Sequence, residues 1–215
     1  MKSNYICNCK HYDFFSKNFL YWENRMVTSD EESIIKYIEK QNYKKKLKIL
    51  HIGVGNSYAY EKLRLNHTIT GITLSNGEIK KAHSYNDKNY IVYYCDKIST
   101  NFKEIFSKFK FDIIIDNNLK SYSCCQKSFE YMFENFVKVL DNNGIIISNK
   151  NGMNWVKKLK PKISFNFKNF FHYKMREIDG NIENIFSMDE ASKISNKFSL
   201  KLTLDNDVVI FSKQL

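Results

Sequence analysis

Apolar and polar stretches alternate along most of the chain, and they predict strands and helices in turn. Short apolar runs predict strands over residues 47–52, 68–74, 90–94, 111–116 and 144–149. The segments between them favour helices over residues 57–64, 76–84, 100–108 and 124–140. Short apolar strands that alternate with helices are typical of a parallel sheet covered on both faces.

The N-terminal part of the chain predicts one more helix ahead of the first strand. Residues 28–32 offer a capping box, made either by Thr28 with Glu31 or by Ser29 with Glu32. Apolar residues at helical spacing follow as far as about Asn42.

The C-terminal part departs from the alternating pattern. Ser187 and Glu190 form a second predicted capping box, with a helix to about Lys197. Residues 198–204 and 208–212 then predict two strands around a tight turn. We therefore expect an α/β fold: a Rossmann-like, doubly wound, mostly parallel seven-stranded sheet with a C-terminal antiparallel hairpin.

Composition favours a globular protein without a membrane segment. The 215 residues are 43% hydrophobic and 15% aromatic, which is enough for one sizeable core. No apolar run is long enough to span a bilayer, and the first residues lack the apolar core of a signal peptide. Five cysteines, an odd number, argue against a disulfide framework. We predict a cytoplasmic protein with no membrane partner.

The net charge of +11 raises the question of a nucleic-acid partner. Nearly all of the cations are lysines, and they are spread along the chain without a basic tail. This distribution is typical of a lysine-rich surface, so nucleic acid is the less favoured partner and a small molecule the favoured one.

A glycine turn follows the first predicted strand. Gly53 and Gly55, with Asn56 and Ser57, stand between that strand and the start of a helix. Glycines at such a turn let the backbone approach a ligand, and free N–H groups at the helix start face it. The turn predicts a site for a nucleotide or a nucleotide-like cofactor.

The glycine turn is the first of four motifs that follow one another along the sequence. They are the glycine turn at 51–57, the end of the second strand at 71–78, Tyr94-Cys95-Asp96, and residues 111–118 with the glycine turn at 139–147. Together with the C-terminal hairpin, they make residues 47–215 resemble the class I S-adenosylmethionine-dependent methyltransferases. The resemblance implies a methyltransferase-like catalytic domain over 47–215, with residues 1–46 as a helical segment that packs on or caps it.

The resemblance also implies a cofactor, S-adenosylmethionine, with S-adenosylhomocysteine as its product, and a set of residues that bind it. These residues are His51, Gly53, Gly55, Asn56, Ser57, Thr73, Leu74, Ser75, Glu78, Asp96, Lys97 and Asn117. Asp96 stands where the family commonly places an acid against the adenine amine. No metal is implied.

The chain departs from the family pattern at three of these positions. The family usually has an acid where this chain has His51, and often a glycine where it has Ser57. An acid often closes the second strand and binds the ribose hydroxyls, where this chain has Thr73. Since a threonine offers no carboxylate, we expect Thr73 and Glu78 to share that role. His51 fits equally well as a hydrogen-bonded core histidine.

The acceptor is expected beyond the carboxyl ends of the strands, which places Asp116 after the fourth strand as a candidate catalytic residue. Residues 142–176 contain eight cations and no acid, interleaved with aromatic residues. This segment predicts a small, anionic metabolite or sugar-type acceptor, with His172 and Tyr173 as candidate bases. The same pattern also fits a lysine-rich surface with aromatics turned inward, or an RNA methyltransferase.

Three other interpretations concern the ends of the chain and the fold itself. Tyr21, Trp22 and Arg25 could cover the cofactor as a lid, or pack on the sheet edge. The spacing of Cys7, Cys9, His11 and Asp13 does not favour a zinc site. A binding protein that kept the fold without efficient catalysis is an alternative, whereas a nicotinamide dehydrogenase is disfavoured because the last glycine of its motif is missing.

Overall fold

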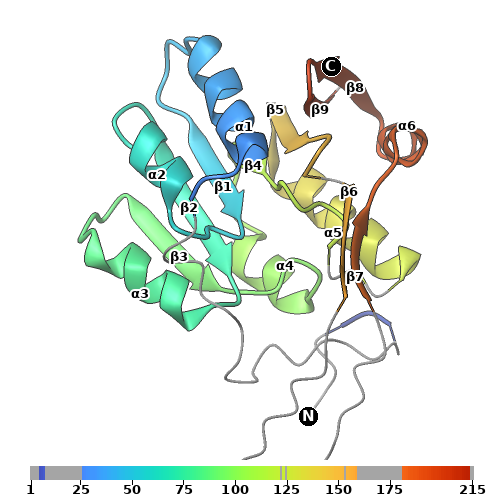
Figure 1. Cartoon of the computed structure of the whole chain (residues 1–215), viewed down its shortest axis with the longest axis horizontal. Coiled ribbons are helices and arrows are strands. Elements are labelled where there is room, and N and C mark those ends of the chain that lie inside the picture. The colour runs from blue at the N-terminus through green and yellow to red at the C-terminus, as the bar shows by residue number, and fades with distance from the viewer. Residues whose placement is uncertain are drawn as a thin grey trace, which may run out of the picture.

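The computed structural model describes residues 5–7, 26–121, 123, 125–152, 154–158 and 181–213. Its centre is a seven-stranded sheet with the strand order β3-β2-β1-β4-β5-β9-β8 (Figure 1). The strands are β1 (Lys48–Ile52), β2 (Thr68–Thr73), β3 (Tyr90–Tyr94), β4 (Phe111–Ile115), β5 (Leu140–Asn149), β8 (Leu200–Asp205) and β9 (Val208–Lys213). The first five strands are parallel, and β9 is antiparallel to both β5 and β8. The predicted mostly parallel sheet with a terminal hairpin is confirmed.

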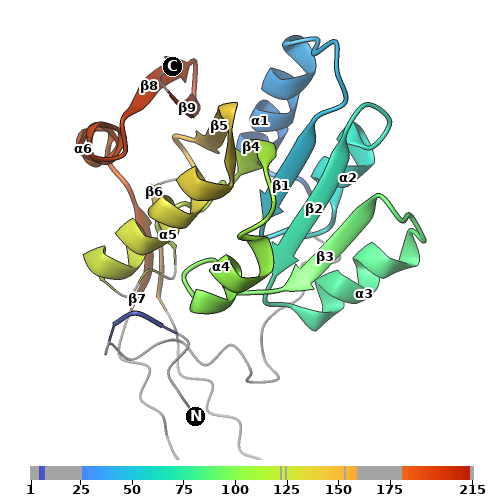
Figure 2. The ribbon, with the colours of Figure 1, turned by 180° about the vertical axis from the view of Figure 1, so that it is seen from behind.

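Helices cover both faces of this sheet, as Figures 1 and 2 show from opposite sides. Their bounds are α1 (Ser29–Lys40), α2 (Tyr58–Leu63), α3 (Asn76–Ser84), α4 (Thr100–Phe106), α5 (Gln126–Val139) and α6 (Met188–Lys197). Buried side chains of α1, α2 and α3 form one hydrophobic cluster with the sheet, and those of α4, α5 and α6 form the other. None of these helices is long and apolar enough to cross a membrane.

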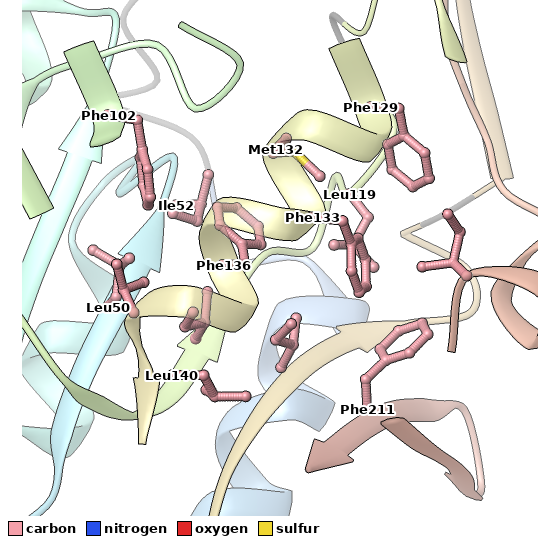
Figure 3. Packing of buried hydrophobic residues seen from close by; sticks show 14 of the residues in the cluster. Leu50, Ile52, Phe102, Leu119, Phe129, Met132, Phe133, Phe136, Leu140 and Phe211 are labelled. Carbon is pink, nitrogen blue, oxygen red and sulfur yellow. The ribbon is translucent and has the colours of Figure 1, made fainter. Parts of the chain in front are cut away.

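The strands divide their side chains between the two clusters because successive residues of a strand point to opposite faces. Leu50 of β1 belongs to the cluster under α4–α6, whereas Ile49 belongs to the one under α1–α3. In the cluster under α4–α6, phenylalanine is the most frequent residue (Figure 3). Phe133 of α5 lies 5.2 Å from the ring of Phe211 on β9, so the C-terminal hairpin is part of this core.

Strand β5 begins four residues earlier than the sequence predicts. Phe111 pairs with Leu140, and the register then shifts so that Ile113 pairs with Ile145. The residues between, 141–143, are polar and exposed. They read as a turn in the sequence because such a bulged strand start lacks the alternation of a regular strand.

The two predicted capping boxes have different outcomes. At α6, Ser187 N–H donates to Glu190 Oε2 (3.1 Å) and Glu190 N–H donates to Ser187 Oγ (3.2 Å), as predicted. At α1, Thr28 is the N-cap residue but its side chain makes no capping hydrogen bond, so the box predicted there is wrong. The first turn of α1 instead directs Asp30 and Ser33 to the carboxyl ends of neighbouring strands.

A second, two-stranded sheet follows β5. Strands β6 (Asn154–Lys158) and β7 (Asn181–Ile185) pair antiparallel, Asn154 opposite Ile185. Figure 1 shows this pair, in orange, on the side of the carboxyl ends of the parallel strands. The sequence analysis did not predict these two strands.

Candidate functional site

The glycine turn lies at the carboxyl end of β1 and is left-handed at three of its residues. The φ angles are +72° at Gly53, +53° at Gly55 and +67° at Ser57. This region is unfavourable for most residues other than glycine. Ser57 is held in it by burial and by the hydroxyl of Tyr90, which donates to Ser57 Oγ (3.0 Å). The serine in place of the family's third glycine therefore keeps the left-handed backbone of the turn.

The turn also packs closely against β2. A Cβ atom at Gly71 would overlap the side chain of Val54 and lie 3.0 Å from Val92, so only glycine fits there. The sequence analysis gave Gly71 no role of its own. A glycine within an apolar strand is the signal for such a close approach.

Glu78, in the first turn of α3, joins the glycine turn to the end of β2. Its Oε2 accepts hydrogen bonds from the Thr73 hydroxyl (2.5 Å) and from the Gly55 N–H (3.2 Å). Ser75 is the N-cap residue of α3, and its Oγ accepts from the Glu78 N–H (3.4 Å). The structure thus brings Thr73 and Glu78 together, next to the turn, at the place where the sequence predicts a ribose site.

Burial changes the pKa of the Glu78 carboxyl. Only 3% of the residue is exposed, and this burial raises its pKa, while the hydrogen bonds from Thr73 and Gly55 oppose the rise. A carboxyl with a raised pKa in the folded state holds its proton in a pH range where the unfolded chain has released it.

This raised pKa predicts a specific dependence of stability on pH. Between the ordinary and the raised pKa the native state binds more protons than the unfolded state, so the free energy of unfolding should fall as the pH rises through that window. Glu78→Gln removes the effect. We therefore expect urea unfolding from about pH 4 to about pH 8 to show the variant gaining stability relative to the unchanged protein as the pH rises. A constant difference across this range would contradict the prediction.

A buried ion pair joins the loops that follow β3 and β4. Lys97 Nζ lies 2.7 Å from Asp116 Oδ2 and also donates to the carbonyl oxygens of Asn118 (2.5 Å) and Leu119 (3.1 Å). The Asn118 N–H donates to Asp116 Oδ1 (3.0 Å). Burial raises the pKa of Asp116, which is 1% exposed, and the Lys97 ammonium opposes this. With both carboxylate oxygens engaged, this geometry favours a positioning role for Asp116 over proton transfer.

Asp96 directly precedes Lys97 of this pair, near the start of the loop after β3. Its Oδ1 accepts from the Ile98 N–H (3.1 Å), and its Oδ2 accepts from the hydroxyl of Tyr5 (2.9 Å). The sequence analysis missed Tyr5, because an isolated tyrosine near the N-terminus carries no pattern that links it to a residue in the sheet.

His51 is buried at the end of β1, with 4% of its surface exposed. Its Nδ1 has no hydrogen-bond partner among the described residues. Burial lowers the pKa of the imidazole to about 4, so the ring is neutral at neutral pH. A neutral ring with an unsatisfied buried nitrogen departs from the hydrogen-bonded core histidine of the sequence analysis and leaves that atom available to a ligand.

The first turn of α1 covers the carboxyl ends of β4 and β5. The Asn117 amide donates to Asp30 Oδ2, and Asn149 Nδ2 donates to Ser33 Oγ (2.6 Å). Asn117 therefore contacts α1, and Asp30 stands at the edge where an acceptor is expected. The sequence analysis assigned no role to Asp30, Ser33 or Asn149.

Two further predicted site residues, Asn56 and Leu74, lie near the glycine turn and the end of β2, and several others lie outside the described part of the chain. Asn56 Oδ1 accepts from the Tyr58 N–H (3.1 Å) at the start of α2, and Leu74 follows Thr73 half-buried. The residues outside the described part of the chain are His172, Tyr173, Tyr21, Trp22, Arg25, Cys9, His11 and Asp13.

The solved structures similar to this one share its fold. A TehB-like SAM-dependent methyltransferase from Corynebacterium glutamicum is 14% identical with a TM-score of 0.54, over 84% of this chain and 86% of that one. A SAM-dependent methyltransferase from Methanosarcina mazei is 13% identical with a TM-score of 0.59, over 83% and 97%. The N-methyltransferase NodS from Bradyrhizobium japonicum, in complex with S-adenosyl-L-homocysteine, is 12% identical with a TM-score of 0.57, over 90% and 97%.

These likenesses define the class of the fold. The chain has the Rossmann-like fold of the class I SAM-dependent methyltransferases, as the sequence motifs predict. No protein-family model matches the sequence, and neither does any curated protein.

Proposed function

We propose that the protein is an S-adenosylmethionine-dependent methyltransferase. The observation that carries this proposal is the contact of Glu78 with both Thr73 and the Gly55 N–H, which places a carboxylate at the glycine turn although β2 ends in a threonine. The neutral His51, with its unsatisfied nitrogen, fits the polar end of such a cofactor. When bound, the cofactor supplies the methyl group.

The chain's own residues divide the task of holding that cofactor. Glu78 and Thr73 accept hydrogen bonds from the ribose hydroxyls, and Asp96 accepts one from the adenine amine. The glycine turn lets the backbone approach the methionine end closely, while its own Gly53, Gly55 and Ser57 N–H groups donate within the protein and hold the turn in shape. Lys97 and Asp116 hold the loops after β3 and β4 in place.

The proposed acceptor is a small anionic metabolite or a sugar-type molecule, methylated on oxygen or nitrogen. Its support is the sequence of residues 142–176, with eight cations, no acid, and His172 and Tyr173 as bases. Because basic residues mixed with aromatics also bind single strands, RNA is the second candidate acceptor. A steep dependence of RNA affinity on salt would favour it.

Calorimetry tests the cofactor directly. We expect the protein to bind S-adenosylmethionine and S-adenosylhomocysteine, and not NAD. At Gly55 a Cβ atom would meet only the Gly53 oxygen, at 4.0 Å, so Gly55→Ala chiefly penalises the left-handed backbone. The free variant relaxes out of this conformation and must return to it when the cofactor binds, so the penalty of about 1–2 kcal/mol corresponds to about a 10-fold loss of affinity. Absence of binding to either sulfur compound would contradict the proposed function, and binding without transfer to any acceptor would favour the binding protein.

A further inference from the structure

Within the described residues 5–7 of the N-terminal segment, Tyr5 reaches the proposed nucleoside site. Tyr5 is 91 positions from Asp96 in the sequence, yet its hydroxyl donates to Asp96 Oδ2 at 2.9 Å. Its ring is partly buried and packs against the hydrophobic cluster under α4–α6. Figure 1 shows the described segment of residues 5–7, in dark blue, on the side of the carboxyl ends of the parallel strands.

Tyr5 and the backbone together fix the orientation of the Asp96 carboxylate. The Ile98 N–H donates to Oδ1 (3.1 Å), and Tyr5 donates to the other oxygen. Asp96 is 8% exposed, so few water molecules can replace either donor. A carboxylate accepts several hydrogen bonds at once, so an amine of a ligand can share it with Tyr5.

We propose that Tyr5 is a positioning residue of the nucleoside pocket, which holds Asp96 so that the pocket selects a 6-aminopurine over a 6-oxopurine. This inference rests on the proposed function. An ionised carboxylate only accepts hydrogen bonds, so it attracts an exocyclic amine and repels a carbonyl oxygen. A 6-oxopurine also carries an N–H on the neighbouring ring nitrogen, and a carboxylate that is free to turn can bind that group instead. Fixing the carboxylate therefore sharpens the discrimination between the two bases.

The test compares the binding of two ligands by calorimetry: S-adenosylhomocysteine and its analogue with hypoxanthine in place of adenine. In Tyr5→Phe we expect the affinity for S-adenosylhomocysteine to fall about 5-fold, because the Asp96 side chain loses one of its two donors and must be ordered when the ligand binds. The affinity for the hypoxanthine analogue should change less, so the preference for adenine falls. Tyr93 packs edge-to-face on Phe106 in the same cluster, and Tyr93→Phe is the matched control, which should leave the preference unchanged.

A second variant distinguishes positioning from general support of the fold. Asp96→Asn introduces an amide that can donate to a 6-oxo group, so it should shift the preference towards hypoxanthine. If Tyr5 acts through the carboxylate, Tyr5→Phe changes the preference in the unchanged protein but not in the Asp96→Asn background. An unchanged preference in Tyr5→Phe, or tighter binding of S-adenosylhomocysteine, would overturn the role of Tyr5 alone. Failure of the unchanged protein to bind S-adenosylhomocysteine would overturn the proposed function and this inference together.

Discussion

Lys97→Met should lower the free energy of unfolding by about 3–5 kcal/mol, the usual cost of removing one partner of a buried ion pair. Asp116, at 1% exposure, would have to bury an unpaired charge or take up a proton, and the carbonyl oxygens of Asn118 and Leu119 would lose their shared donor. Urea unfolding followed by circular dichroism measures the change. A loss below about 1 kcal/mol would show that the pair contributes little.

The chain offers a matched control for this variant. Lys45 Nζ lies 2.5 Å from Asp112 Oδ1, but the Lys45 side chain is 68% exposed. An exposed pair contributes about 0.2–1 kcal/mol, so Lys45→Met should lose no more than that. Replacing both buried partners, as Lys97→Met with Asp116→Leu, should recover part of the stability, because no unpaired charge is then buried.

The sheet could be predicted because its strands carry a local signal. The runs that became β1, β2 and β4 are short, mostly buried on both faces and bounded by polar residues, which indicates parallel strands. The edge strand β3 alternates instead, with Tyr90 and Val92 buried and Ile91 exposed. Strands β6 and β7 follow no such pattern: Asn-Trp-Val-Lys-Lys shows neither an apolar run nor regular alternation. The pairing of β6 with β7, which are separated by residues 159–180, could therefore not be predicted from the sequence pattern.

The residues of the candidate site also fall into two groups, those that the sequence predicts and those that it does not. The glycine turn lies between β1 and α2, and Thr73 and Glu78 lie in the next strand–turn–helix unit, β2–α3, so short motifs of the sequence predict their proximity. Tyr5 and Asp30 reach the site from 91 and 87 positions away in the sequence. Contacts over such separations depend on how the whole chain folds, and no periodicity or short motif records them.

The departures from the family pattern also become clearer in three dimensions. Ser57 keeps the left-handed backbone of the glycine it replaces, with Tyr90 as its partner. Glu78 brings a carboxylate from α3 to the end of β2, where Thr73 alone offers only a hydroxyl. Two of the three departures thus retain the physical feature that the family's residue provides, whereas His51 replaces an acid by a neutral ring.

Glu78→Ala should weaken the binding of S-adenosylhomocysteine by about 100-fold or more. In the proposed complex the carboxylate accepts hydrogen bonds from two ribose hydroxyls, and each bond to a charged group contributes about 1.5–3 kcal/mol. Two of them correspond to at least about 3 kcal/mol, and every 1.4 kcal/mol is about tenfold in affinity. Calorimetry near neutral pH measures the loss.

Graded variants show whether the charge or the shape of Glu78 matters. Glu78→Gln keeps the length of the side chain and one acceptor oxygen, so it should retain more affinity than Glu78→Ala while still losing about tenfold. Thr73→Val removes one hydroxyl and should have a smaller effect than either. Glu61 of α2 accepts from Tyr85 outside the turn, and Glu61→Ala should bind as the unchanged protein does. Equal affinity of Glu78→Ala and Glu61→Ala would mean that the ribose is held elsewhere, because the carboxylate at the glycine turn would then contribute nothing to the complex.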